Sequence, residues 1–316
     1  MKPVIIPAMA AVAALAASVP AFAQQAPGPE VEIEHTVARV AVVVEDRTDI
    51  AVEIEQGSSG LPVVRVTRDG ANVRIDGGLS SRSFLNRRSS IGNCRSGAEG
   101  GQPGANASVE VRNVGRVNLS DAPLIVIRTP RNVNVEASGA VFGSVGRGAA
   151  SVELHTSGCG NWNVANTEGP VSLGIGGSGD IRAGTSSSMD VEIGGSGSVT
   201  LGATGDLDIS IGGSGSIVAA TARGLEVAIG GSGDVAVARI DGPLDVSIAG
   251  SGDVLVRGGT SPDVSVSMLG SGDVTFNGVA GDVDVSIMGG GDVTIARATG
   301  SVSRSIAGGG DVRIGN

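Results

Sequence analysis

The sequence is poor in the residues that binding and catalytic sites use most. Its 316 residues include no tyrosine, one tryptophan, four phenylalanines, two cysteines and two histidines. Ligand clefts are commonly lined by aromatic side chains, so this scarcity argues against a polysaccharide lyase or hydrolase. With His35, His155, Cys94 and Cys159 as the only imidazole and thiol ligands, a zinc site is not expected.

Basic residues are scarce as well. Lys2 is the single lysine, and without it 21 arginines stand against 32 acidic residues, so 21 − 32 gives a net charge of −11. An acidic chain without basic clustering argues against a nucleic-acid partner.

The first residues have the features of a secretion signal over 1–23. Lys2 supplies the positive end, residues 4–19 a mostly apolar core, and residues 21–23 a small-residue cleavage site before Gln24. The apolar core is too short for a membrane span. We therefore expect an exported protein, periplasmic, secreted or at the cell surface, with no transmembrane segment after signal removal. Residues 24–30 are expected to be a tether.

A glycine-rich phrase recurs through the second half of the chain. It reads GGSGDI at 176–181 and GGGDV at 308–312. The residue after its last glycine falls at Asp180, Ser198, Ser216, Asp234, Asp253, Asp273, Asp292 and Asp311. The spacings are 18, 18, 18, 19, 20, 19 and 19 residues, and a fixed period near 20 indicates a stacked repeat.

Apolar residues alternate within each period. Val235 and Val237 follow one glycine phrase, and Leu244, Val246 and Ile248 follow the next turn. Alternation with period two indicates strands with one buried face, and stacking ~4.8 Å apart lets such short strands pair. The sequence predicts an all-β fold: a parallel β-helix, or β-solenoid, with rungs of 18–20 residues, two short strands and two tight corners in each, and about eight or nine rungs.

One domain is expected over 31–316. Its first part, 31–135, is a less regular β region that contains a loop at 77–107, and regular rungs occupy 136–316. Four arginines of the loop lie close together in the sequence: Arg82, Arg87, Arg88 and Arg95. A solvated loop is the favoured interpretation, and a contact site for an anionic polymer is the alternative.

The recurring Asp or Ser is interpreted as a turn-forming residue. Both have a short side-chain oxygen that accepts a hydrogen bond from a nearby backbone N–H in a turn. The glycines of the phrase are expected to provide positive φ angles at the corners. Calcium binding at this position is the alternative, but the phrase lacks the spacing of the calcium-binding nonapeptide and occurs once per rung.

A second column of acidic residues is expected on the outward face of the solenoid. Its members are Asp190, Asp208, Glu226, Asp245 and Asp284, with Ser265 interrupting the series. The favoured explanation is solubility and protection against aggregation. Weak binding of divalent cations such as Ca²⁺ along the column is the alternative.

Cys94 lies in the expected loop and Cys159 in an early corner. In an oxidising compartment a disulfide between them is the simple expectation, and it would attach the loop to the body of the protein. A pair of free thiols is the alternative. His155 lies near Cys159, but no third group is identifiable, so a nucleophilic site is not expected.

Several features together resemble a known family. They are a strand at 124–128, a Thr129–Pro130 turn, a strand ending in Ser138 and Gly139, and the Gly-Ser-Gly-Asp-Val units that follow. This combination resembles the bacterial domain called the putative auto-transporter adhesin, head GIN domain, over residues 38–314. The resemblance implies a β-helical fold and an exported protein whose function is not settled.

We therefore expect a non-enzymatic solenoid that serves as a binding or structural element of the cell envelope, with an envelope or surface ligand and no cofactor. A calcium-binding surface protein is the first alternative, and a polysaccharide-acting β-helix enzyme the second. In a column that is otherwise Val or Ile, the last rung has Arg304, which predicts a frayed or capped end. That last rung, with Ile314, is also expected to offer an edge for end-to-end pairing of two copies.

Overall fold

The computed structural model describes residues 28–80, 90–95 and 103–315. The predicted signal sequence therefore lies outside the described residues, as do residues 24–27 of the predicted tether. Its last residue, Glu30, already belongs to the first strand, β1 (Glu30–Val44). Within the described ranges all regular structure is β, and no helix there could cross a membrane.

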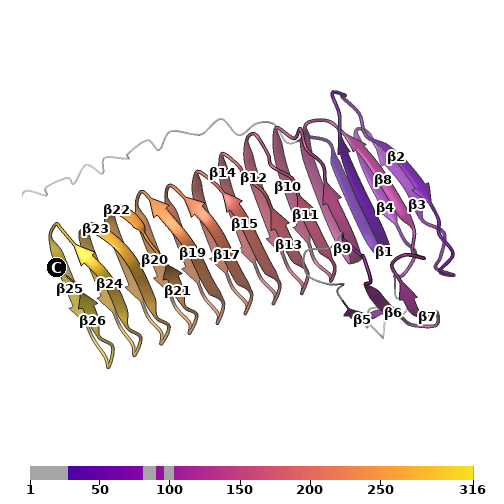
Figure 1. Cartoon of the computed structure of the whole chain (residues 1–316). Coiled ribbons are helices and arrows are strands. Elements are labelled where there is room, and N and C mark those ends of the chain that lie inside the picture. Colours follow the sequence, from indigo (N-terminus) through magenta and orange to yellow (C-terminus); the bar gives the residue numbers. More distant parts are fainter. Residues whose placement is uncertain (1–27, 81–89, 96–102, 316) are drawn as a thin grey trace, which may run out of the picture.

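From residue 132 onward the chain coils into about ten turns of a β-solenoid, which confirms the predicted fold class (Figure 1). The turns contain β9 (Asn132–Val145), β10 (Ser151–Thr156), β11 (Asn161–Val164), β12 (Pro170–Ile175), β13 (Asp180–Ala183), β14 (Ser188–Ile193), β15 (Ser198–Ala203), β16 (Asp206–Ile211), β17 (Ser216–Ala222), β18 (Leu225–Ile229), β19 (Asp234–Asp241), β20 (Leu244–Ile248), β21 (Val254–Val256), β22 (Gly259–Met268), β23 (Val274–Ile287), β24 (Val293–Ala298), β25 (Val302–Ile306) and β26 (Val312–Ile314).

Parallel pairing places equivalent residues of successive rungs side by side. Ile181 is the partner of Val199, and Val199 is the partner of Ile217, all three being 1% exposed. One apolar core therefore runs along the inside of the stack. Each buried aliphatic side chain contributes about 1.5–3 kcal/mol before entropy is subtracted, so every added rung extends the core by a similar amount.

The predicted pair of tight corners in each rung is wrong for the rung that contains β23. β23 runs through a corner without a break, since its first residues pair with β24 and its last residues with β25. A register shift between Phe276 and Val279 marks the bend. The Phe276 ring occupies the space where a side chain at Gly278 would lie, so the strand can bend there without a turn.

The N-terminal part is a mixed sheet that continues the stack and closes its end (Figure 1). β1 lies parallel to β9 on one side, and on the other to β4 (Asn72–Asp76) and β8 (Leu124–Thr129). Two antiparallel strands follow outward, β2 (Ala51–Glu55) on β8 and β3 (Arg65–Asp69) on β4. Charged residues on these outer strands hinder pairing with another chain.

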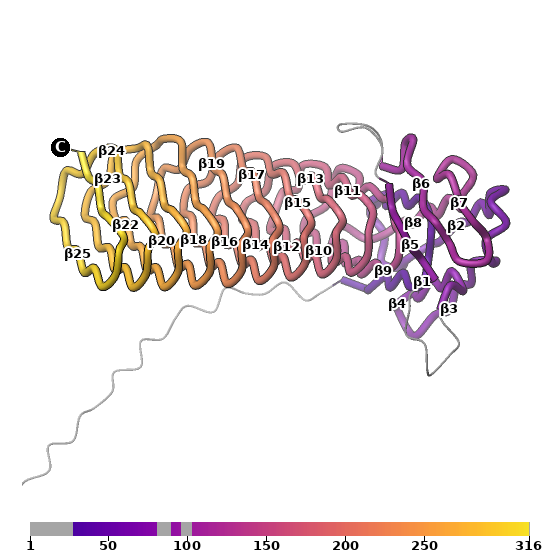
Figure 2. The backbone as a smooth tube through the Cα atoms, turned by 90° about the horizontal axis from the view of Figure 1, so that it is seen from below, coloured from indigo at the N-terminus to yellow at the C-terminus, as the bar shows by residue number. Residues whose placement is uncertain are grey.

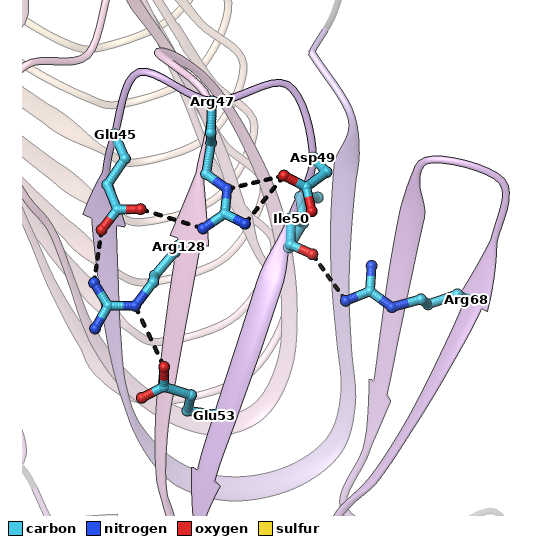
Figure 3. A network of polar contacts seen from close by, with 7 residues as sticks. All are labelled: Glu45, Arg47, Asp49, Ile50, Glu53, Arg68 and Arg128. Atoms are coloured by element: carbon cyan, nitrogen blue, oxygen red, sulfur yellow. Dashed lines mark hydrogen bonds and ion pairs between the residues drawn. The ribbon is translucent and has the colours of Figure 1, made fainter.

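Ion pairs connect the outer strands to the stack (Figure 3). Glu45 lies between two guanidinium groups, 3.2 Å from Arg47 Nη1 and 2.6 Å from Arg128 Nη1. Arg128 Nε also reaches Glu53 on β2 at 3.4 Å. Exposed pairs of this kind each contribute little, so their main effect is to align β2 against β8.

The predicted loop at 77–107 contains a strand. β5 (Ile91–Arg95) pairs with β6 (Ser108–Val111), which pairs with β7 (Gly115–Asn118), and this three-stranded side sheet flanks the solenoid (Figure 2). It forms a second core with Val37 and Phe142, each 1% exposed. β5 contains Gly, Asn, Cys and Arg without apolar alternation, so sequence pattern could not reveal it. Arg95 lies in β5, whereas Arg82, Arg87 and Arg88 lie outside the described residues.

The expectation that the corner glycines need positive φ is also wrong. Two columns of glycine pass through the phrases, and in them only Gly160 and Gly308 have φ between +20° and +160°. The columns are Gly158, Gly177, Gly195, Gly213, Gly231, Gly250, Gly270, Gly289 and Gly308, and Gly160, Gly179, Gly197, Gly215, Gly233, Gly252, Gly272, Gly291 and Gly310. A Cβ added at Gly213 would collide with the carbonyl oxygen of Gly195 in the rung before. Glycine is required here by the close approach of stacked backbones.

Adjacent glycines provide a direct test of that requirement. We expect Gly213→Ala to lower the free energy of unfolding by more than about 2 kcal/mol, because overpacking against a backbone cannot be relieved by a rotamer change. Gly212→Ala should be neutral or stabilising, because a Cβ there meets nothing within 4 Å. The equivalent position in later rungs is Leu269 and Met288. Urea unfolding followed by circular dichroism measures both variants, and equal losses would contradict the explanation.

Candidate functional site

The recurring Asp of the glycine phrase accepts a hydrogen bond from the next rung. Asp253 Oδ1 accepts from the backbone N–H of Asp273 at 2.8 Å, and Asp273 Oδ1 accepts from Asp292 N–H at 2.9 Å. The bond therefore spans 18–20 residues, and the expectation of a bond within one turn is wrong in this respect. Where the position is serine, Ser216 Oγ donates to Ser198 Oγ at 3.3 Å.

The series ends differently at the last described rung. Asp311 Oδ1 accepts from the N–H of Val312 at 2.8 Å, while its Oδ2 lies 2.9 Å from Arg313 Nη2. Arg313 also bonds Asp292 at 3.0 Å, and this bond, with the N–H of Asp311, holds the pKa of Asp292 below its usual range. Arg304 donates to the carbonyl of Val312 at 3.4 Å, so the arginines of this rung stabilise its open side.

The second acidic column lies in register on one exposed sheet. We call it the acidic face; its members are Asp190 on β14, Asp208 on β16, Glu226 on β18, Asp245 on β20 and Asp284 on β23, with Ser265 on β22 between the last two. Beside it, two residues further along each strand, runs a mostly serine column: Ser210, Ala228, Ser247, Ser267, Ser286 and Ser305. The arrangement is a flat strip of carboxylates bordered by hydroxyls.

Partial burial, followed by the charges of nearby carboxylates, raises the pKa of two carboxyl groups of the acidic face. For Asp208 the causes are partial burial, then the charges of Glu226, Asp190 and Asp206. For Asp190 the causes are burial and the charge of Glu192, opposed by His155. Like charges on neighbouring strands destabilise a sheet, so these residues lower stability while they are ionised.

A shallow depression lies where the acidic face begins. It is lined by Glu136, His155 and Glu192 around Gly174. A Cβ at Gly174 would meet the His155 ring, and His155 Nε2 lies 3.4 Å from Glu153 Oε1. His155 therefore lies on the outward face among carboxylates and not beside a nucleophile. Glu136 and Glu192 were not among the predicted site residues. Gly174 stands between His155 and Glu192 in the same outward column, and this loss of a side chain was the available signal in the sequence.

The structure pairs Cys94 with Cys159 in a disulfide. The two Cα atoms are 6.3 Å apart and the residues are separated by 65 positions. Cys94 belongs to the side sheet, while Cys159 forms a parallel bridge with Ala140 in the solenoid. The bond therefore fastens the side sheet to the stack at the edge of the second core.

These features define the chain as a β-solenoid with a closed N-terminal end and ordered polar columns on its outer faces. It belongs to the family described as "Putative auto-transporter adhesin, head GIN domain", whose model matches residues 36–222 and 218–316. This confirms the resemblance noted in the sequence.

No curated protein matches the chain. A putative adhesin from Parabacteroides distasonis ATCC 8503, known from a crystal structure, aligns with 92% of this chain and 94% of its own, at 15% identity and a TM-score of 0.39. That likeness is too weak to support an argument about function.

We expect the disulfide to stabilise the attachment of the side sheet. The Cys94→Ser, Cys159→Ser double variant should unfold with a free energy lower by about 4 kcal/mol or less, as expected for closing a loop of this length. Thiol titration of the wild type without reductant should find no free cysteine. A wild type with two reactive thiols, or a double variant of unchanged stability, would contradict the assignment.

The raised pKa of Asp208 predicts a pH-dependent gain for Asp208→Asn. At pH 7 the substitution removes a crowded carboxylate, so the free energy of unfolding should rise by about 0.5 kcal/mol. A pKa higher in the folded state means that the cost of ionisation is present above that pKa. It is absent below the unfolded value of 3.8, where the gain should vanish. Urea unfolding at pH 7 and at a pH below 3.8 tests this, with Asp46→Asn as the control. A lower free energy of unfolding for Asp208→Asn at pH 7 would contradict the prediction.

Proposed function

We propose that this chain is a non-enzymatic, exported β-solenoid that binds a component of the bacterial cell envelope or cell surface through its acidic face. The observation that carries the proposal is the in-register column of five carboxylates on one exposed sheet. Membership of a family described as the head of auto-transporter adhesins supports both export and attachment as the role.

The acidic face suits an extended, positively charged ligand. Its carboxylates repeat at about 4.8 Å because strand pairing sets the spacing. The backbone beneath them is held by parallel pairing on both sides, so the charges are already ordered before a ligand arrives, and little entropy is lost on binding. Complementary charge would also raise the association rate and make binding sensitive to salt.

A polysaccharide-acting enzyme is less well supported. Glycosidases place two carboxyl groups on either side of a scissile bond, about 5–9.5 Å apart. In the depression at Gly174, Glu136 and Glu192 are three strand spacings apart, about 14 Å. Neighbours in the acidic face are closer, but they lie in one row on an open sheet.

Calcium binding by the acidic face is the second candidate function. Partial burial and then the charges of Glu226 and Asp190 raise the pKa of Asp208, and a divalent cation beside Asp208 would relieve that charge repulsion. In that case the cation would also connect the carboxylates to an anionic ligand, so the two candidates differ in their response to chelator.

Binding to washed envelope fragments from the producing bacterium tests the proposal. In a sedimentation assay at 150 mM salt, the triple variant Asp190→Asn, Asp208→Asn, Glu226→Gln should bind at least about fivefold less than wild type, because three central charges are lost. The control Asp46→Asn, Asp69→Asn, Glu55→Gln makes the same change in net charge at the N-terminal end.

The outcomes separate the candidates. Weaker binding by the acidic-face triple variant alone supports the proposal. If wild-type binding is then unchanged by EDTA, the ligand is cationic. If EDTA abolishes wild-type binding, calcium bridges the acidic face to an anionic ligand. Equal binding by the two triples, or no binding by the wild type, would overturn the acidic face as the site.

A further inference from the structure

A second polar site, separate from the acidic face, lies at the first bend of β1. His35 has φ = +50°, and the pairing of β1 with β9 shifts register between Ile33 and Thr36. In a straight strand, successive side chains project to opposite faces. The bulge at His35 changes this, and its Nδ1 atom lies 3.8 Å from Oε2 of the preceding residue, Glu34.

A carboxylate from another strand completes the group. Asp76, the last residue of β4, is the direct strand partner of Glu34, and its Oδ1 atom lies 3.7 Å from His35 Nδ1. The backbone around it is held in place, since Gly78 N–H donates to Asp76 Oδ1 at 2.8 Å and Gly77 N–H donates to the Glu34 carbonyl at 3.0 Å. One ligand atom from each of the three side chains lies within 4.8 Å of the other two.

The three groups match the donors of a divalent transition metal. An ion about 2.0–2.2 Å from one imidazole nitrogen and two carboxylate oxygens places those atoms about 3.3–3.6 Å apart, so small side-chain movements would suffice. The side chains are 25%, 46% and 37% exposed for Glu34, His35 and Asp76, which leaves room for water ligands. The imidazole favours transition metals over Ca²⁺ and Mg²⁺, which prefer oxygen alone.

Arg74 is the one competing cation that the described contacts place near the group. Its Nη2 atom lies 2.7 Å from Glu32 Oε2, while its Nε is 3.8 Å from Glu34 Oε1. Glu32 is therefore the closer partner of Arg74, and the other oxygen of Glu34, Oε2, is the one that faces His35. An ion at His35 would use that oxygen without displacing Arg74.

We propose that Glu34, His35 and Asp76 bind one divalent transition-metal ion, with water completing its coordination. The ion would link β1 to β4 at the bend and stabilise the folded N-terminal rungs, since it binds only where the two strands are paired. This site is independent of the acidic face. A zinc site was not expected from the sequence because His35, His155, Cys94 and Cys159 are its only imidazole and thiol ligands; that argument left out carboxylates, and Asp76 is 41 residues from His35.

Zinc titration of metal-stripped protein, residues 24–316 without a histidine tag, tests the site by calorimetry. Wild type should bind one Zn²⁺ per chain, and both His35→Asn and Asp76→Asn should bind at least tenfold more weakly. Asparagine tolerates the left-handed conformation at 35, and at 76 its carbonyl still accepts the Gly78 N–H, so both variants should remain folded. His155→Asn removes the other histidine and should leave binding unchanged.

Circular dichroism of each variant confirms that the fold is retained. The proposal is overturned if wild type shows no saturable binding at one ion per chain, if His35→Asn binds as tightly as wild type, or if His155→Asn alone loses the site. Equal competition by Ca²⁺ or Mg²⁺ would contradict a site that depends on imidazole.

Discussion

The whole structure depends on the hydrogen-bonded spacing between parallel strands. At about 4.8 Å, each rung must present the same shape as the one before it, and any side chain that projects along the axis collides with backbone. That is why Gly195 and Gly213 follow one another in a column, and why Gly212, one residue away, can be replaced by Leu269 in a later rung. Close stacking therefore requires glycine at particular positions within each rung, and the other glycines of the repeated motif can be replaced.

The same spacing repeats every polar group, with opposite consequences in two places. In the corner column, repetition aligns a carboxylate with the N–H of the next rung, as between Asp253 and Asp273, so each carboxylate has a hydrogen-bond donor. In the acidic face it aligns carboxylate with carboxylate, as between Asp208 and Glu226, and partial burial followed by the charges of Glu226 and Asp190 raises the pKa of Asp208. Like charges on neighbouring strands oppose pairing, as at Asp208, so this column is more readily explained by binding than by folding, and this is the physical basis of the proposed function.

The N-terminal part is built differently, because the first rung of the stack would otherwise leave backbone N–H and C=O groups unpaired on its outer side. Antiparallel β2 and β3, with ion pairs such as Glu45 with Arg128, cover the side where a further rung would pair. The side sheet covers Phe142, which points away from the main core, and the disulfide at Cys159 fastens it. The bend at His35 also belongs to this region, where irregular backbone brings side chains together that a regular strand would separate.

The sequence by itself determined the class of fold and the outward columns, because period-two alternation and a period of 18–20 residues specify both the buried face and the register. Asp190 and Asp208 could be placed side by side from their spacing alone. Only the tertiary structure decided the rest. Four features depend on backbone segments that are distant in sequence. They are the hydrogen-bond partner of each corner Asp, the need for glycine in the two glycine columns, the strand that contains Cys94, and the proximity of His35 to Asp76. No local pattern encodes such approaches, since they arise only when the rungs are stacked.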